Sequence, residues 1–426
     1  MTTHAFPRLP VSTLVASGEA ELKTGPFGTQ LKASEYTEVG TPVINVRNIG
    51  MGSIKPDKLE FISESTRDRL SGHVLRPGDI VFGRKGAVER HVFIRAEQDG
   101  WFQGSDCLRL RLNSSRVEPL FASYFFLTEE HQRWMMNQCS HGATMASLNQ
   151  AVLQRIELPV PPLEVQQRIA GVLSAYDELI ENSQRRIQIL EAMARALYRE
   201  WFVEFRFPGH ERVPLVASAL GEIPKGWGVS PLGSVCERIT DGSHKSPPSV
   251  NEGYPMASVK DMTDWGIDID GCRRIGAEDY RELMRNHCKP LKNDVLVAKD
   301  GSYLKHTFVV GDEQDLVILS SIALLRPNAA VLPNYLSFTL REPGTKARMT
   351  GFVSGVAIPR IVLKDFRHFL VLVPPPDIQA KWARQVDPEV NLCRTLVSQV
   401  RHLRRTRDLL LPRLLSGQVT LADTAA

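Results

Sequence analysis

The chain has 426 residues, of which 42% are hydrophobic and 23% are charged, and its formal net charge is +4. This length is sufficient for two or three domains with hydrophobic cores of their own. The nearly balanced charge excludes a disordered tail protein and a strongly basic nucleic-acid coat protein, so any DNA contact must come from local patches.

The first 160 residues are expected to form one globular domain. Short β-type runs separated by glycine and proline occupy positions 42–46, 80–82, 92–94 and 107–112, and a helical stretch follows from Pro119 to Met136. Several strands combined with few helices indicate an α+β domain rather than a regular βαβ repeat. We therefore predict an α+β domain over residues 1–160.

A long helix is predicted over residues 161–206. After the opening segment from Pro161 to Gln166, apolar side chains recur in steps of four and three residues, interrupted by Ser183. This heptad spacing makes helices pair along one seam. The seam positions are Ile169, Leu173, Tyr176, Ile180, Ile187, Leu190, Ala194, Leu197 and Trp201.

A linker rich in proline and glycine, residues 207–221, leads to a second domain over residues 222–373. The second domain repeats the order of the first at an offset of 213 to 215 residues, which pairs Asp79 with Asp294 and His91 with His306. Self-similarity at a constant offset indicates a tandem duplication. Most side chains differ between the copies, so one scaffold is expected to carry two different surfaces.

The first helix has a copy at an offset of 213, over residues 374–417, followed by a frayed tail at 418–426. Its apolar seam positions are Trp382, Val386, Cys393, Leu396, Val400, Leu403, Leu410 and Leu414, whereas Glu389 and Arg407 are charged and could face a partner. Proline is costly inside a helix and Asp-Pro is a good helix start. We therefore expect a break at Asp387-Pro388 that leaves an uninterrupted helix of about 26 residues, ~40 Å long.

Two dissimilar domains, each followed by a similar long helix, resemble the specificity (S) subunit of type I restriction-modification systems. The matching segments are 161–166 with the first heptads, 221–227, 75–80 and 414–419, and their order, found twice, carries the resemblance. The resemblance implies an α+β fold with two pseudo-symmetric target recognition domains separated by two long antiparallel coiled-coil helices.

The resemblance also implies a non-catalytic subunit of a type I restriction endonuclease and DNA methyltransferase complex. Each domain would bind one half of a bipartite site in double-stranded DNA, and the paired helices would act as a spacer and dock two methyltransferase (M) subunits, joined by restriction (R) subunits. S-adenosylmethionine, ATP and magnesium are expected on those partner subunits, with no cofactor, metal or catalytic residue on this chain.

Basic and amide side chains on loops are the candidates for DNA contact, because phosphate contacts position a protein while base-edge contacts specify sequence. The set is Thr29, Gln30, Lys32, Arg47, Asn48, Arg84, Lys85, Arg90 and His91 in the first domain, and His244, Lys245, Lys260, Asp261, Lys299, Lys305 and His306 in the second. Arg84 and Lys85 are the leading pair, because the following Gly86 permits close approach to a phosphate. Thr144 and Met145, after Gly142, are candidates for a further DNA-facing loop, although a helix-capping turn is the favoured interpretation.

Two other interpretations remain open. A DNA-acting enzyme is one: Asp79 with Lys85 and Asp294 with Lys299 loosely resemble a nuclease triad, but Gly83 and Val297 stand where a second carboxylate should be. Neither an amino-methyltransferase tetrapeptide nor a phosphate-binding loop is present. The other is a coiled-coil scaffold that binds only protein, which would leave the basic loops unexplained.

The six cysteines form no CxxC pair and have no zinc-like spacing, which indicates buried thiols in a reducing compartment. The N-terminus has no signal-peptide pattern, and no apolar run reaches the roughly 18 residues that span a bilayer. We therefore expect a cytoplasmic protein without a membrane contact.

Overall fold

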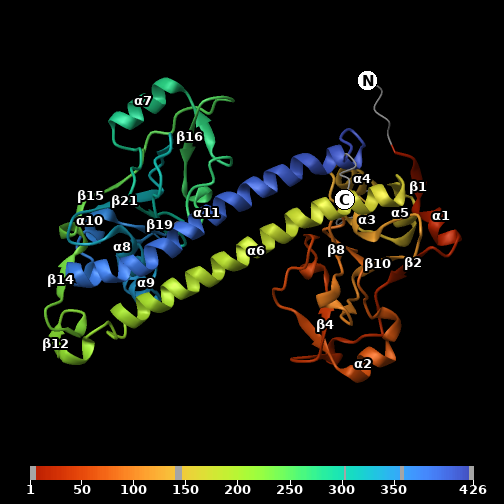
Figure 1. Cartoon of the computed structure of the whole chain (residues 1–426), viewed down its shortest axis with the longest axis horizontal. Coiled ribbons are helices and arrows are strands. Elements are labelled where there is room, and N and C mark those ends of the chain that lie inside the picture. Colours follow the sequence, from red (N-terminus) through yellow and green to blue (C-terminus); the bar gives the residue numbers. More distant parts are fainter. Residues whose placement is uncertain (1–5, 140–145, 302–303, 356–358, 422–426) are drawn as a thin grey trace. The chain divides into compact units, whose positions relative to one another are not determined.

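The computed structural model describes residues 6–139, 146–301, 304–355 and 359–421. The chain divides into two compact units, Met1–Ile180 with His402–Ala426, and Glu181–Arg401. Each unit contains one globular domain and part of two long helices, α6 and α11 in Figure 1.

Domain 1, the globular part of the first unit, begins at β1 (Arg8–Pro10) and ends at β11 (Glu157–Pro159), and these two strands pair in antiparallel register. Its larger sheet has the strand order β2-β10-β7-β8-β5 and its smaller sheet the order β3-β6-β4-β9. The strands are β2 (Ala20–Thr24), β3 (Tyr36–Thr37), β4 (Thr41–Ile44), β5 (Met51–Gly52), β6 (Glu60–Ile62), β7 (Ile80–Gly83), β8 (His91–Phe93), β9 (Phe102–Gln103) and β10 (Cys107–Leu112). The helices are α1 (Val11–Ala16), α2 (Glu64–Arg69), α3 (Pro119–Phe126), α4 (Glu129–Cys139) and α5 (Gln150–Gln154).

Domain 2, the globular part of the second unit, begins at β14 (Gly228–Pro231) and ends at β24 (Leu370–Val373), which again pair with each other. Its larger sheet has the order β15-β21-β18-β19 and its smaller sheet the order β17-β16-β20. The strands are β15 (Cys236–Asp241), β16 (Tyr254–Ala257), β17 (Arg273–Ile275), β18 (Val295–Ala298), β19 (Thr307–Val309), β20 (Val317–Ile318), β21 (Ile322–Pro327), β22 (Val353–Ser354) and β23 (Arg360–Ile361). The helices are α7 (Ala277–Arg285), α8 (Pro333–Arg341), α9 (Pro343–Met349) and α10 (Leu363–Phe366).

The two domains share a common core topology, to which domain 1 adds the edge strands β5 and β3, and this confirms the predicted pseudo-symmetric α+β duplication. The order β2-β10-β7-β8 corresponds strand for strand to β15-β21-β18-β19, and β6-β4-β9 corresponds to β17-β16-β20. Side chains along β10 point alternately to the two faces of the sheet, and Leu108, Leu110 and Leu112 all pack into the main hydrophobic cluster of domain 1. Arg109 and Arg111, between them, point to the other face of the sheet.

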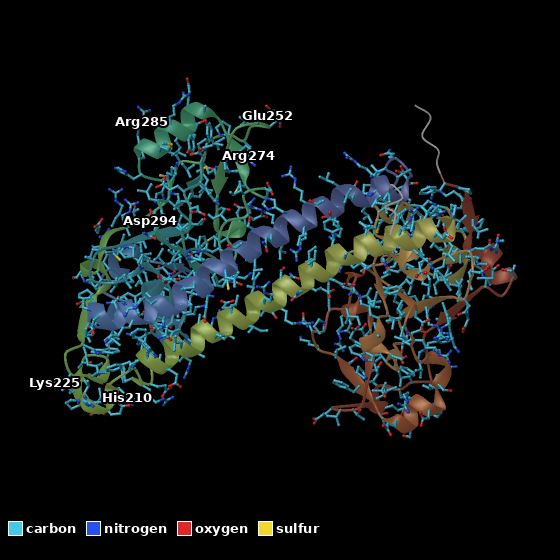
Figure 2. All side chains as sticks on the ribbon, viewed as in Figure 1. His210, Lys225, Glu252, Arg274, Arg285 and Asp294 are labelled. Carbon is cyan, nitrogen blue, oxygen red and sulfur yellow. The ribbon has the colours of Figure 1, made fainter. Side chains whose placement is uncertain are left out.

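The predicted linker contains ordered structure. A hairpin of β12 (Leu215–Ser218) and β13 (Gly221–Pro224) precedes domain 2, and Figure 2 labels His210 and Lys225 before and after it. Phe207 and Trp227, which flank the hairpin, are buried with their ring centroids 5.1 Å apart. The two ends of the segment and Ile223 are therefore anchored in the core of the second unit, while strand β12 is mostly exposed.

The two long helices have the same length and the predicted offset. Helix α6 spans Leu163–Phe202 and α11 spans Pro376–Leu415, 40 residues each. A buried glutamine fixes the start of each helix: Gln166 accepts a hydrogen bond from the amide of Glu118 and donates to the carbonyls of Arg116 and Pro161. Gln379 makes the equivalent bonds with Leu332, Ala330 and Pro374. The repeated Pro-Pro and Gln pattern is thus a clamp between each helix and its domain.

The helices run antiparallel within each unit. In the first unit, Arg407 of α11 pairs with Asp177 of α6 at 2.5 Å. In the second unit, the ring of Tyr198 on α6 lies 6.0 Å from that of Trp382 on α11. Contacts thus join the beginning of one helix to the end of the other, and the predicted seam residues of both helices, from Ile169 to Leu414, are buried or half-buried.

Arg407 does not need an external partner, because it is satisfied inside the first unit. It pairs with Asp177, whose second oxygen accepts a hydrogen bond from Tyr124 at 2.7 Å. At the equivalent positions of the second unit the side chains are all apolar and buried, namely Ala194, Val390 and Phe338. One copy of the seam is therefore polar where the other is hydrophobic.

The predicted break at Asp387-Pro388 is wrong, because α11 continues through it. Trp382, Val386 and Val390, on either side of the proline, are buried in the core of the second unit. Proline removes one backbone hydrogen bond, and packing on both sides offsets that cost. At ~1.5 Å per residue the continuous helix is ~60 Å long rather than the expected ~40 Å.

Candidate nucleic-acid interface

The predicted DNA-contact loops of domain 1 leave the sheets at one end. Strand register places the end of β2, at Thr24, and the end of β7, at Gly83, beside the start of β10 at Cys107. The segment after β4 joins them, since the amide of Gly104 donates to the carbonyl of Ile44. We call residues 25–35, 45–50, 84–90 and 104–106 the loop end of domain 1.

Domain 2 has an equivalent loop end. Register brings the end of β15, at Asp241, and the end of β18, at Ala298, beside the start of β21 at Ile322. The amide of Leu319 donates to the carbonyl of Ala257, as in the first copy. We call residues 242–250, 258–261, 299–301, 304–306 and 319–321 the loop end of domain 2, and all seven candidates of this domain lie within it.

Most candidates of domain 1 are accessible. Thr29, Gln30, Lys32, Arg47 and Lys85 are exposed, and Arg84 and Arg90 are half-buried. Three of the cations already have acidic neighbours, because Arg47 pairs with Glu60 at 2.6 Å, Lys85 with Asp106 at 3.2 Å and Arg90 with Glu89 at 3.3 Å. Among the described residues, Lys32 and Arg84 have no ion-pair partner.

Two candidates of domain 1 are buried and have structural roles. Asn48 closes the turn after β4, because its side chain accepts from the amide of Asn45 and donates to the carbonyls of Lys55 and Asp57. His91 is fully buried and lies 2.8 Å from the hydroxyl of Ser123, and burial lowers its pKa to about 3. Neither side chain can reach DNA from this position.

In domain 2, His244, Lys245, Lys260 and Lys305 are exposed, and Lys245 pairs with Glu282 at 2.8 Å. Asp261 is buried and accepts from the amide and hydroxyl of Ser258, which repeats the role of Asn48. Lys299 is also buried and pairs with Asp241 at 2.6 Å. His306 pairs with Asp264 at 2.9 Å.

The predicted pairing of His91 with His306 is wrong by one residue. In domain 1 the register places Phe82 opposite His91, and in domain 2 it places Val297 opposite Thr307. His91 is therefore equivalent to Thr307, because the connection between β18 and β19 is one residue longer than that between β7 and β8. His306 corresponds to Arg90, another polar side chain of the loop end.

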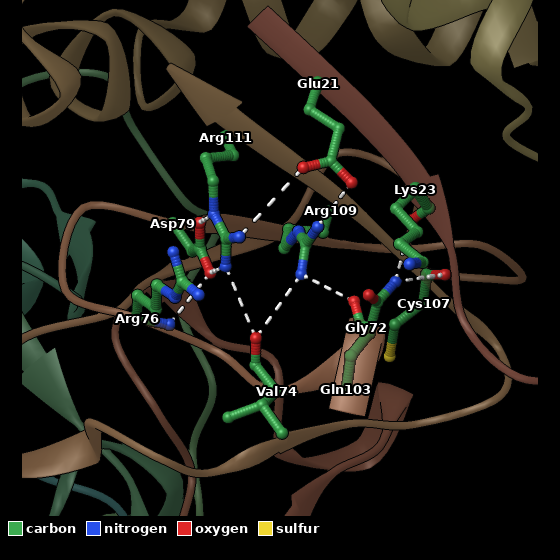
Figure 3. Close-up of polar contacts among 10 residues, drawn as sticks. All are labelled: Glu21, Lys23, Gly72, Val74, Arg76, Asp79, Gln103, Cys107, Arg109 and Arg111. Carbon is green, nitrogen blue, oxygen red and sulfur yellow. Dashed lines mark hydrogen bonds and ion pairs between the residues drawn. The ribbon is translucent and has the colours of Figure 1, made fainter. Parts of the chain in front are cut away.

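Asp79 and Asp294, the acids of the nuclease hypothesis, are both bound by arginines inside the domains. Asp79 accepts two hydrogen bonds from Arg111, at 2.6 and 2.7 Å (Figure 3). These bonds raise the pKa of Arg111. Asp294 makes the same pair with Arg326, at 2.7 and 2.8 Å. Both oxygens of each buried carboxylate are occupied by an arginine, so neither is directed at a substrate. Within the described ranges, no group of three or more His, Cys, Asp or Glu side chains could hold a metal ion.

Domain 1 has an additional buried arginine beside this pair. Figure 3 shows Arg109 next to Arg111. The guanidinium of Arg109 donates hydrogen bonds to Glu21 at 2.7 Å and to the carbonyls of Gly72 and Val74 at 3.2 and 3.4 Å. The equivalent residue of domain 2 is Leu324, which is buried in an apolar cluster. The charge is therefore a feature of one copy only.

Sequence reasoning missed one exposed aromatic side chain at the loop end. Phe27 is 61% exposed and precedes Gly28, whose φ of 64° gives the chain a tight turn. Pro26 and two glycines around a single phenylalanine were the available signal. Thr144 and Met145 lie outside the described residues.

Comparisons with known proteins decide the family. Residues 24–192 and 224–400 match the family described as type I restriction modification DNA specificity domain. The chain belongs to this family. The two matched segments correspond to the two copies, each with a domain and the first part of its long helix.

Relatives in this family cover most of the chain. A type I restriction enzyme MjaIX specificity subunit from Methanocaldococcus jannaschii is 27% identical over 311 residues, 70% of this chain and 69% of that protein. A putative MjaX specificity subunit from the same organism is 24% identical over 396 residues, 90% of this chain and 88% of that protein. The crystal structure of the type I restriction-modification S subunit from M. genitalium has a TM-score of 0.61, with 17% identity and 97% coverage of both chains. The structural likeness shows a common fold.

Proposed function

We propose that this specificity-family protein binds a bipartite site in double-stranded DNA, with one half of the site bound at the loop end of each domain. The observation that supports this is the same strand order built twice with different exposed side chains at equivalent loops. A duplicated scaffold with divergent loops suits two different half-sites, because base-edge contacts by side chains specify sequence.

Catalysis is proposed to belong to partner subunits. Asp79 and Asp294 are paired with arginines, and a nuclease site on this chain would need them free. Two methyltransferase subunits and the restriction subunits would supply S-adenosylmethionine, ATP and magnesium chemistry. A cytoplasmic location fits the six cysteines, which are all free thiols, and within the described chain no helix has the length and apolarity of a membrane span.

The helices α6 and α11 are proposed to set the distance between half-sites and to dock the methyltransferase subunits. Each glutamine clamp fixes a helix to its own domain, so a change in helix length would move that domain by a set amount. Lengthening both helices by a whole heptad, ~10 Å at ~1.5 Å per residue, should therefore widen the gap between half-sites.

Exchange of residues 1–160 for those of a relative tests the proposal. The chimaera is expressed with the methyltransferase subunits, and modified bases are mapped by sequencing the DNA. We expect one half of the recognised sequence to change and the other to persist, with the reciprocal result for residues 222–373. Changes in both halves would contradict independent domains, and magnesium-dependent cutting by the purified chain would contradict a non-catalytic role.

A further inference from the structure

An exposed aromatic ring occupies the same position in both domains. Strand register makes the last residues of β2 and β15, Thr24 and Asp241, equivalent to each other. Phe27 and His244 each follow three residues after that strand end. Phe27 is 61% exposed, and the side chain of His244 is 78% exposed. Each loop end therefore presents a flat ring at an equivalent point of the chain.

The backbone before each ring is fixed in the same way. The amide of Gly25 donates to the carbonyl of Cys107 at 2.9 Å, and the amide of Gly242 donates to that of Ile322 at 3.2 Å. A Cβ on Gly25 would lie 1.9 Å from a backbone oxygen, and one on Gly242 2.1 Å from another. Both positions therefore require glycine, and both loops leave their strands along the same closely packed path.

Local hydrogen bonds also fix the turn that carries each ring. The carbonyl of Phe27 accepts from the amide of Gln30 at 3.3 Å. In domain 2 the hydroxyl of Ser243 accepts from the amide of Lys245 at 3.0 Å, and this bond encloses His244. A side chain on a fixed turn loses little conformational freedom when it binds.

Neither domain uses its ring for internal packing. Within the described residues, Phe27 belongs to none of the hydrophobic clusters of domain 1. One edge of His244 lies 3.4 Å from Asp241, which leaves the faces of the imidazole uncovered. Phenylalanine has no charge for a phosphate and no donor or acceptor for a base edge. The property that the two side chains share is a flat aromatic face.

We infer that Phe27 and His244 insert into the DNA and stack on bases, one ring in each half-site. The inference rests on the proposed function, in which the two loop ends bind DNA. Every base has a π face, so an aromatic side chain can stack on any of them. Methyltransferases extrude their target base from the duplex, and a ring that enters the opened step offsets the lost base stacking.

The test uses the full chain with its methyltransferase subunits and a duplex that carries the recognised site, mapped as above. F27A and H244A each remove one ring, and H244F keeps a flat ring but removes the hydrogen-bonding atoms. V39A is the control, because Val39 is 80% exposed and precedes β4, at the end of that strand opposite to the loop end. The three side chains are exposed, so unfolding by urea should match that of the wild type.

We expect F27A and H244A each to lower the affinity about 5- to 100-fold, and H244F and V39A to bind as the wild type does. The slope of log affinity against log salt should not change, because no phosphate contact is lost. Thymines of both half-sites should become reactive to permanganate, which oxidises unstacked thymines, in the wild-type complex. F27A should suppress this reactivity only in the half bound by domain 1.

Absent DNA binding by the wild type, or a recognised site without two halves, would contradict the proposed function itself. Unchanged affinity in F27A and H244A, an equal fall in V39A, or no reactive thymine in either half would overturn only this inference. A relaxed preference for one base in F27A would also overturn it, because the ring would then read a base edge. So would loss of methyltransferase co-purification in F27A, which would assign the ring to a protein contact.

Discussion

Domains 1 and 2 share a core topology but differ in which polar side chains they bury. Both retain the buried pair of an aspartate and an arginine, Asp79 with Arg111 and Asp294 with Arg326. Around it, domain 1 buries further polar groups, whereas domain 2 has apolar or hydroxyl side chains at the same positions. The shared groups hold strands and helices in register, whereas the polar groups buried in domain 1 alone are incompletely paired. Among the described residues, His91 Nδ1, His131 Nε2 and Arg109 Nε have no hydrogen-bond partner.

The largest effect should come from breaking the shared pair. Asp79→Asn removes the nearer counter-charge of the largely buried Arg111, whose other acidic neighbour, Glu21, lies 4.0 Å away, and loss of one partner of such a pair costs about 3–5 kcal/mol. Asp294→Asn should cost less, because the side chain of Arg326 is 27% exposed against 14% for Arg111. Hydrogen exchange resolved by peptide measures the loss in each domain.

The double variant Asp79→Leu/Arg111→Met is the control for that experiment. Replacing both partners removes the unpaired charge, so its stability should return toward that of the wild type. A double variant as unstable as Asp79→Asn would show that the cost lies in packing rather than in the charge.

The second effect is a difference in acid stability. Burial lowers the pKa of His91 and of His131 to about 3 in domain 1, whereas the equivalent residues of domain 2 are Thr307 and Thr345. Because the unfolded chain has the ordinary histidine pKa of about 6.5, it binds more protons than the folded domain below that pH. Stability is therefore complete above about pH 6.5 and falls toward pH 3, by about 1.4 kcal/mol per pH unit for each histidine.

Urea unfolding between pH 7 and pH 4, followed by hydrogen exchange, checks this difference. Domain 1 should lose protection before domain 2, and His91→Thr, which copies domain 2, should reduce the pH slope of domain 1 by about a third, because burial also lowers the pKa of His131 and of His73. If both domains lost protection at the same pH, and His91→Thr did not alter the pH slope, the buried histidines would not be the cause of the acid sensitivity.

The smallest effect concerns two equivalent cations of the loop ends. Arg84 is half-exposed and has no ion pair among the described residues, whereas its counterpart Lys299 is buried against Asp241. Arg84→Gln should lower the salt slope of DNA binding by about 0.9 and leave stability unchanged. Lys299→Gln should leave the slope unchanged and destabilise domain 2. Equal effects on the slope would show that the two residues have the same role.

The sequence by itself determined the duplication, the α+β class and the two long helices with their apolar seams. These features depend on periodicity and order along the chain, which a single sequence displays directly. The bounds of α6 and α11 differ by the offset of 213 that the Pro-Pro motifs gave.

Only the tertiary structure decided which charged groups are free. The polar side chains predicted to contact DNA include His91, Asn48, Asp261 and Lys299, yet all four are buried. They are hydrogen-bonded to Ser123, Asn45, Ser258 and Asp241, respectively. The continuity of α11 through Pro388 was decided in the same way, by apolar side chains packed on either side of it. Local sequence gives the chemistry of a side chain, but burial and pairing depend on residues brought close by the fold, and those contacts determine whether a cation stabilises the domain or remains available to bind phosphate.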